Sequence, residues 1–358
     1  MLARRYTLIP ALGLTLSALT AGVVAAAQAP QISKPRPAPP FPTTMPPLPP
    51  AVIDNTLAIG GDDINARAAE TRMTVEVRVN RTGPYRFVVD SGADTSVVGH
   101  RIARDLQLPL GTPAILNATT ARSVVDRVRV NELLLGSTAF RDLELPALRE
   151  QDLGGHGMIG IDALVNQRLM MDFEKHVIKV EDARQPAKFV RGEIVIMARR
   201  RRGQLILTEV TAAGLSLDAV IDTGSAITIG NTALRDKLGF KRRNRDKFWT
   251  VEATGVTGVT VPLQLARIAE LKLGPVTLRN VPMAFADVPP FEVFGISKEP
   301  ALLLGTDILE KFRRVQLDFR ARKVRFQLRR CASTGIMVGT SPNASITRLS
   351  GDREACLR

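Results

Sequence analysis

The stretch FVVDSGADTSVV, residues 87–98, places Asp90 at the end of an apolar run suited to a buried strand. The stretch AVIDTGSAITIG, residues 219–230, repeats this order, with Asp222 opening an Asp-Thr-Gly triplet between apolar residues. A carboxylate at the end of a buried strand costs desolvation free energy unless hydrogen bonds or a functional role compensate. Two such carboxylates in matched surroundings predict a shared role.

Both stretches belong to a long internal repeat. Residues 73–92 align without a gap with residues 205–224, and each copy reads as strand, polar turn, strand and Asp-Ser/Thr-Gly. Three later landmarks recur in the same order: VNELLLG with IAELKLG, GMIGIDAL with LLLGTDIL, and MDFEKHVIKV with LDFRARKVRFQL. The repeat predicts an all-β fold with a few short helices, built as two lobes related by a pseudo-twofold axis. The short helices are expected after each Gly-x-Asp, with Asp162 and Asp307 as their N-caps.

The N-terminus has the pattern of a secretory leader. A basic start, an apolar run rich in small residues and an Ala-x-Ala ending predict a signal peptide, cleaved after Ala27, and hence a periplasmic or secreted protein. Proline at high density then predicts an extended spacer. The expected organisation is a signal peptide (1–29), a Pro-rich linker (30–50), an irregular lead-in (51–70), an N-terminal lobe (71–182), an interlobe linker (183–192), a C-terminal lobe (193–329) and a tail (330–358).

Composition limits the other classes of function. The chain has 358 residues and a formal net charge of +14, but aromatic residues are only 4%, so base stacking on nucleic acid is not expected. The three histidines are scattered, no metal-ligand spacing occurs, and no cofactor is expected. Cys331 and Cys356 could form a disulfide in an exported protein or stay as free thiols.

The paired triplets resemble the aspartic protease superfamily of retropepsins and pepsins. That family carries Asp-Thr/Ser-Gly-Ala/Ser after an apolar strand and a later apolar-apolar-Gly. Both marks occur in each half of this chain: Asp90-Ser91-Gly92-Ala93 with Met158-Ile159-Gly160, and Asp222-Thr223-Gly224-Ser225 with Leu303-Leu304-Gly305. The resemblance covers residues 71–329 and is closest to bacterial retropepsin-like proteins with two fused repeats. It implies pepsin-like lobes with a cleft between them.

The resemblance also assigns roles to these residues. Asp90 and Asp222 are expected to meet in the cleft as a catalytic dyad that shares one proton and activates a water molecule for hydrolysis of a peptide bond. Gly92 and Gly224 allow the backbone to pack tightly around the carboxylates. Ser91 and Thr223 are expected to cross-link the two loops beneath the dyad. Because both triplets lie in one chain, a monomer is expected to suffice.

The sequence leaves open the roles of the residues around the dyad. Asp94 resembles a retropepsin residue that contacts the substrate backbone, but a turn-stabilising carboxylate explains it equally well. Residues 251–264, with two glycines, predict a hairpin flap, whereas residues 115–130 occupy the same place without a glycine. No flap tyrosine is present. Trp249 could fill a cleft pocket or belong to the core.

Two other functions stay open. The same fold could bind peptides without turnover, or the chain could be an envelope protein that binds anionic polymers through its basic runs at 198–203 and 241–247. Solvated turns are the simpler interpretation of those runs. Dependence on Asp90 and Asp222 separates catalysis from peptide binding, and salt-sensitive binding that ignores both aspartates would indicate the polymer-binding protein.

Overall fold

The strands predicted around each Asp-Ser/Thr-Gly triplet are present. In β4 (Arg72–Val79) the three valines are buried, whereas Glu76 and Arg78 between them are exposed. This period of two is that of a strand with one face on the core. The strand that leads into the triplet, β5 (Thr82–Val89), ends in three residues that are buried on both faces. That explains its unbroken apolar run.

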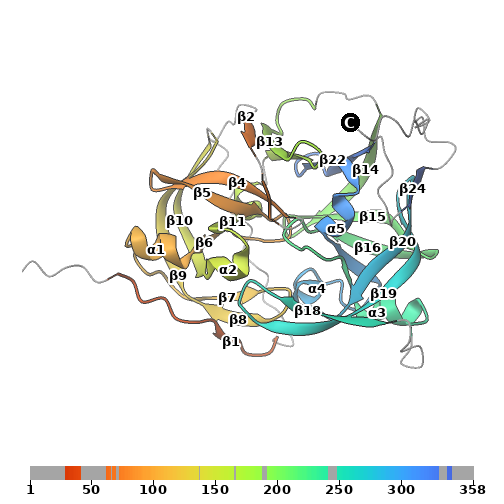
Figure 1. The fold of residues 1–358 in the computed structure, drawn as a ribbon, viewed down its shortest axis with the longest axis horizontal. Helices are drawn as coiled ribbons and strands as arrows, with labels where there is room; N and C mark the ends of the chain where they lie inside the picture. Colours follow the sequence, from red (N-terminus) through yellow and green to blue (C-terminus); the bar gives the residue numbers. More distant parts are fainter. Residues whose placement is uncertain are drawn as a thin grey trace, which may run out of the picture.

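The structure is a computed structural model, and Figure 1 shows the lobes side by side. It describes residues 29–41, 62–65, 67–69, 72–136, 138–164, 167–187, 192–240, 248–329 and 337–340. The predicted leader before residue 29, the basic run 241–247 and both cysteines lie outside the described residues.

Each lobe contains a closed barrel of six strands, and the two barrels match strand for strand. In the first lobe the pairing of β4 with β9 closes the barrel, and in the second lobe the pairing of β15 with β19 does so. The first barrel consists of β4, β5, β11 (Gly157–Ile159), β6 (Val97–Gly99), β10 (Thr138–Leu148) and β9 (Arg127–Leu135). The second consists of β15 (Gln204–Ala212), β16 (Leu215–Ile221), β21 (Ala301–Leu304), β17 (Ile229–Gly230), β20 (Val276–Phe285) and β19 (Thr260–Leu273).

The helices are short and also occur in equivalent pairs. The pairs are α1 (His100–Asp105) with α3 (Thr232–Lys237), α2 (Glu150–Leu153) with α4 (Pro289–Val293), and the 3-10 turn η1 (Ile161–Ala163) with α5 (Thr306–Leu309). The last pair lies where short helices were predicted after each Gly-x-Asp. The fold is therefore mainly β with two retropepsin-like lobes, as the repeat predicts.

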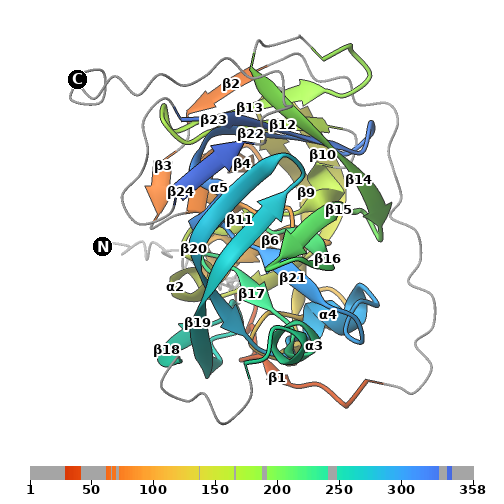
Figure 2. The ribbon, with the colours of Figure 1, turned by 90° about the vertical axis from the view of Figure 1, so that its right-hand side faces the viewer.

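A shared antiparallel sheet joins the lobes on the side opposite the flaps (Figures 1 and 2). Both predicted hairpins supply its centre: β12 (Gln167–Asp172) with β13 (Val177–Asp182), and β22 (Phe312–Asp318) with β23 (Lys323–Leu328). At its ends β2 (Asp62–Asn65) pairs with β13, and β14 (Glu193–Arg201) pairs with β23. The pairing of β12 with β22 crosses the pseudo-twofold axis.

Two reciprocal ion pairs fix that crossing. Arg168 Nε lies 3.0 Å from Asp318 Oδ2, and Arg314 Nε lies 2.6 Å from Asp172 Oδ2. Arg168 and Arg314 are equivalent positions of the repeat, as are Asp172 and Asp318, so each lobe gives one cation and one anion to the other. Burial alone would raise the pKa of Asp172, but the hydrogen bond and charge of Arg314 outweigh it and lower the pKa. This pair therefore stabilises the fold above the pKa of the unfolded Asp and loses its effect in acid.

Several residues before the first barrel form β-strands that the sequence did not predict. The region predicted to be an irregular lead-in contains two strands, β2 and β3 (Arg67–Ala69), and β3 pairs with β4. Part of the predicted spacer is also paired, because β1 (Arg36–Pro37) lies antiparallel to β8 (Arg122–Val125). At the other end of the chain, β24 (Met337–Thr340) pairs with β20.

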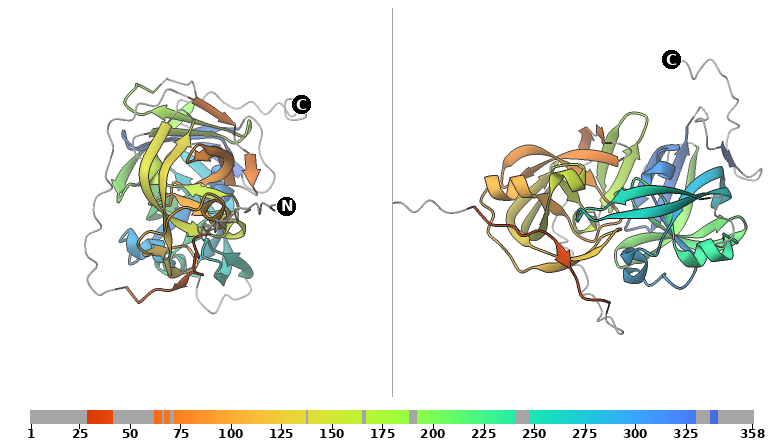
Figure 3. Two further views of the ribbon diagram at one scale, coloured as in Figure 1. Left: turned by 90° about the vertical axis from the view of Figure 1, so that its left-hand side faces the viewer. Right: turned by 60° about the horizontal axis from the view of Figure 1, so that its bottom comes forward.

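Hairpins extend from both lobes over the same side of the molecule. They are β7 (Ala114–Asn117) with β8, and β18 (Trp249–Thr254) with the start of β19. The right-hand view of Figure 3 shows the β18–β19 hairpin reaching from the second lobe over the first. No helix among the described residues is long and apolar enough to cross a membrane.

The buried ion pairs make a prediction about stability. Replacing Arg168 by Met leaves Asp318, whose side chain is 2% exposed, without its cation. Removing one partner of a buried pair costs about 3–5 kcal/mol, so urea unfolding should show a loss of that order. The matched control is Arg184→Met, which removes a surface partner of Asp182 and should change little. Equal losses in both variants would contradict a special role for the buried pair.

Candidate active site

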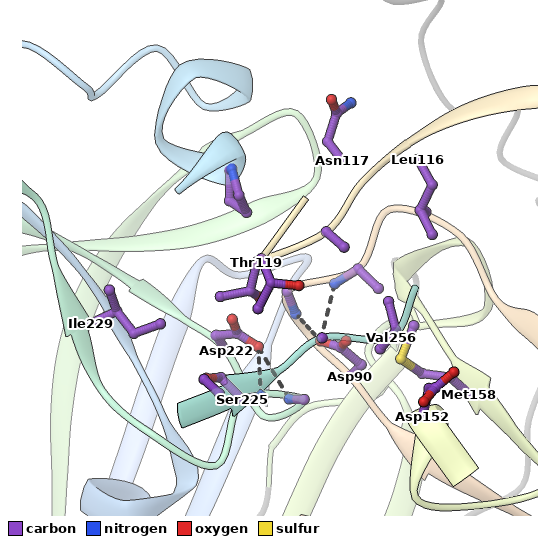
Figure 4. Close-up of a pocket in the computed structure, with 18 of the residues that line it drawn as sticks. Asp90, Leu116, Asn117, Thr119, Asp152, Met158, Asp222, Ser225, Ile229 and Val256 are labelled. Carbon is purple, nitrogen blue, oxygen red and sulfur yellow. Dashed lines mark hydrogen bonds between the residues drawn. The ribbon is translucent and has the colours of Figure 1, made fainter. Parts of the chain in front are cut away.

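Asp90 and Asp222 follow equivalent strands, β5 and β16, and the structure brings them together (Figure 4). Each carboxylate is held by its own loop in the same way. Asp90 Oδ1 accepts hydrogen bonds from the backbone N–H of Gly92 at 2.7 Å and of Ala93 at 3.1 Å. Asp222 Oδ1 accepts from Gly224 at 3.1 Å and from Ser225 at 3.0 Å. One oxygen of each carboxylate is therefore occupied by its loop.

The two glycines are required by the closeness of the loops. A Cβ atom on Gly92 would lie 2.6 Å from Asp222 Oδ1, and one on Gly224 would lie 2.1 Å from the Asp90 carboxylate carbon. Real Cβ atoms do not approach other heavy atoms this closely. Each glycine thus makes room for the carboxylate of the other lobe.

Ser91 and Thr223 link the loops across the lobe boundary. Ser91 Oγ donates to the carbonyl of Ile221, and Thr223 Oγ1 donates to the carbonyl of Val89. Each hydroxyl also accepts the backbone N–H of the other residue: Ser91 N lies 2.9 Å from Thr223 Oγ1, and Thr223 N lies 3.2 Å from Ser91 Oγ. Both residues are buried. Four hydrogen bonds therefore fix the distance between the loops.

The electrostatics of the pair are asymmetric. Asp222 is buried, with 7% of its surface exposed, whereas Asp90 is only half-buried. Burial, followed by the negative charge of Asp90, raises the pKa of Asp222 well above its ordinary value. Two adjacent carboxyl groups that share a proton titrate as a unit. Asp222 is the more buried of the two, so burial disfavours its charged form more than that of Asp90.

A second layer of hydrogen bonds supports each loop, and it corrects the role expected of Asp162 and Asp307. The N-cap positions are taken by glycines, and neither aspartate caps its helix. Asp162 instead accepts from the backbone and hydroxyl of Ser96 at 2.8 and 2.7 Å. Asp307 makes the same pair of contacts to Thr228.

These hydroxyls in turn bind the apolar-apolar-Gly segments. Ser96 Oγ accepts the N–H of Gly160, and Thr228 Oγ1 accepts the N–H of Gly305, each at 3.0 Å. Sequence reasoning missed this layer. The available signal was a Ser or Thr at the same offset from the aspartate in both halves, Ser96 after Asp90 and Thr228 after Asp222.

A cavity of about 530 Å³ lies over the two carboxylates. Both lobes and both hairpins line it, with Leu116 and Met158 from the first lobe and Ile229, Leu263 and Val293 from the second among its apolar residues. Figure 4 shows Thr119 above the carboxylates and Val256 beside Met158. The lining also contains polar side chains such as Asn117, Thr119 and Gln151. A covered cleft with both apolar and polar walls and two carboxyl groups at its floor suits an extended peptide.

The hairpins meet over this cavity. A Cβ atom on Gly255 would lie 2.1 Å from Thr120 Oγ1, so the tip of the second hairpin touches the tip of the first. Val256 packs against a buried cluster of the first lobe that includes Val88 and Leu153. The hairpins therefore cover the cleft as flaps. Trp249 is 38% exposed and stacks with Arg267, so it neither lines the cavity nor belongs to the core.

Asp94 faces the cavity but is also held from the other lobe. Gln204, fully buried at the start of β15, donates through Nε2 to Asp94 Oδ1 at 2.9 Å and to the carbonyl of Gly92 at 3.1 Å. Burial raises the pKa of Asp94, and the Gln204 hydrogen bond and the charge of Arg202 partly offset that rise. Ala226, the repeat partner of Asp94, has no such group. Gln204 was not predicted, because nothing in its local sequence signals a contact across the lobes.

Comparison with known families agrees with this geometry. The model of a family described as aspartyl protease matches residues 75–163 and 208–308, which together exceed half of the chain. The chain belongs to the aspartyl protease family. The two matched segments contain Asp90 and Asp222, and each ends at an apolar-apolar-Gly segment and the turn that follows it. No curated protein matches the sequence. Among the described residues, no group of three or more His, Cys, Asp or Glu side chains is arranged to hold a metal ion.

The link between the loops can be tested with Thr223→Val, which keeps the shape of the side chain and removes its hydroxyl. The N–H of Ser91 and the carbonyl of Val89 then lose their partner in a buried site. Unsatisfied buried groups cost about 1–3 kcal/mol each, so the loss of two partners should lower the free energy of unfolding by about 2–6 kcal/mol. The matched control is Thr208→Val, at an exposed position of β15. A Thr223→Val variant as stable as this control would show that the hydroxyl does not hold the loops together.

Proposed function

We propose that the protein is an endopeptidase that hydrolyses peptide bonds with Asp90 and Asp222 as its catalytic pair. The observation that carries the proposal is the pair itself. Two carboxyl groups are brought together by reciprocal loops, one of them with its pKa raised by burial, at the floor of a covered cleft. Asp162, which supports a loop, differs from the pair in that donors from other residues reach both of its oxygens.

The proposed reaction needs no covalent intermediate. Ionised Asp90 takes a proton from a water molecule while the oxygen of that water attacks the peptide carbonyl carbon. Protonated Asp222 gives its proton to the carbonyl oxygen, so a neutral tetrahedral diol forms. In the second step Asp90 returns its proton to the amide nitrogen, Asp222 takes back a hydroxyl proton, and the carbon–nitrogen bond breaks. The pair ends in its starting state.

The loops favour this sequence because they fix both groups before the substrate arrives. Each carboxylate accepts two backbone hydrogen bonds from its own loop, which favour the ionised form of both, so the greater burial of Asp222 is what favours its neutral form. A preorganised pair avoids the reorganisation that carboxyl groups in water would need.

The mechanism predicts the behaviour of Asp90→Asn and Asp222→Asn. Each variant should lower kcat by at least about a thousandfold, and the double variant should be little worse, because residues that act as a unit are not additive. The pH profile of the wild type should be a bell whose limbs are the two apparent pKa values of the pair. Asp236→Asn, at an exposed position, is the matched control and should keep wild-type activity.

The Asp222→Asn variant should be more stable than the wild type even though it is less active. A carboxyl group whose pKa is raised on folding lowers stability above the pKa of the unfolded state, so Asp222→Asn should raise the melting temperature at pH 7. Wild-type turnover in either single variant would eliminate the two-aspartate mechanism. Peptide binding without turnover in the wild type would indicate a binding module, and salt-sensitive binding of a polyanion that persists in both variants would indicate the envelope protein.

We also propose that the monomer is the active species, because one chain supplies both carboxylates and both flaps. Specific activity should therefore be constant from micromolar to low nanomolar enzyme, with light scattering reporting the mass of one chain. A loss of specific activity on dilution that tracks dissociation of a dimer would contradict this proposal.

A further inference from the structure

Residues 29–41 lie along the outer edge of the first flap, and we call this segment the strap. The strap supplies a third strand to the flap, since β1 pairs with β8 in the register Arg36 with Val124 and Pro37 with Ser123. The pairing continues past β1, where the N–H of Ala38 donates to the carbonyl of Arg122 at 3.0 Å. The first flap is thus a sheet of three strands.

The strap is also attached beyond the flap. At its start, the N–H of Ser33 donates to Asp126 Oδ2 at 2.7 Å, at the base of β8. At its end, Phe41 packs against a buried cluster that belongs entirely to the second lobe and includes Phe291 and Val293. The segment therefore runs from the base of one flap across to the opposite lobe (Figure 3).

One side chain couples the strap to the cleft. The guanidinium of Arg122, on β8, stacks over the ring of Phe41 at 4.6 Å. Its Nε also donates to Asn117 Oδ1 at 3.1 Å, and Asn117 lines the cavity over the catalytic pair. Because Phe41 is anchored on the second lobe, movement of the first flap away from the cleft would pull Arg122 and β8 away from the strap or pull Phe41 off that lobe.

Among the described residues, no segment restrains the second flap in the same way. In the described part of the chain β18 is the edge strand of its sheet, and no segment pairs with its outer side. The flaps are therefore held differently, although the lobes that carry them are repeats of each other. The sequence explains the difference, because the Pro-rich segment precedes only the first lobe.

We propose that the strap is a built-in restraint on access to the cleft: it clamps the first flap shut across both lobes, and its release lets peptide in. This inference rests on the proposed function for the choice of peptide as the ligand. Pro37, Pro39 and Pro40 suit the role, because proline stiffens an extended segment and limits further pairing on its free side.

The test uses the full chain with Ala38→Pro, which removes the N–H donated to Arg122, and Phe41→Ala, which removes the anchor on the second lobe. Hydrogen exchange of amides 114–125 should become about fivefold faster in Ala38→Pro and about tenfold faster in Phe41→Ala. Amides of the barrels should exchange as in the wild type. Lys34→Ala, at an exposed position of the same segment, is the control and should have no effect.

The second measurement is the association rate of a fluorescent apolar hexapeptide with a hydroxyethylene group in place of its central amide. Release of the strap should raise this rate by factors similar to those for flap exchange. Unchanged flap exchange in both variants, faster exchange with an unchanged association rate, or no association in any variant would each overturn the proposal. Faster exchange and association in a protein that cleaves no peptide would support the strap and refute only the proposed catalysis.

Discussion

The reciprocal hydrogen bonds of Ser91 and Thr223 are the interaction on which the site depends. They join the two triplet loops beneath the carboxylates and cross from one lobe to the other. Two carboxyl groups brought this close repel each other when both are ionised, and burial penalises the charge further. The hydrogen bonds of Ser91 and Thr223 hold the loops together against this repulsion. Because these groups are uncharged, they do not compensate the negative charge of the carboxylates. Protonation of one carboxyl group removes the repulsion. A pair with one protonated and one ionised group is the state that acid–base catalysis would require.

The shared sheet, on the opposite side of the molecule, also fixes the two lobes relative to each other. Its crossing of β12 with β22, fixed by Arg168–Asp318 and Asp172–Arg314, sets the relation of the two lobes. Lobes that rocked about this crossing would change the separation of the carboxylates. The buried ion pairs make the crossing specific, because a slip of the register would leave buried charges unpaired. Structure far from the cleft thus limits the geometry of the pair.

Much of this architecture could be predicted from the sequence, because the same sequence landmarks occur in the same order in both halves. The barrels, both hairpins of the shared sheet and the partnership of Asp90 with Asp222 follow from matched landmarks. Contacts that occur in only one half cannot be found by comparing the two halves. Gln204 acts on Asp94 through a contact between lobes, and no local pattern encodes the distance between them. The error on Asp162 and Asp307 has a related cause, since an aspartate before a helix has the same sequence signature whether it binds its own helix or a neighbouring loop.

The departures from symmetry concentrate where a peptide would bind, and the chemistry gives a reason. A peptide has a direction, so its two halves present different groups to the two lobes. Two identical lobes would accept it in either orientation, whereas a chain with both lobes fused can vary them separately. Here Asp94 and Gln204 act on one side only, the first flap is restrained along its outer edge, and the second is anchored at its tip by Val256. The loops that hold Asp90 and Asp222 keep the symmetry of the repeat, while the surface around them has lost it.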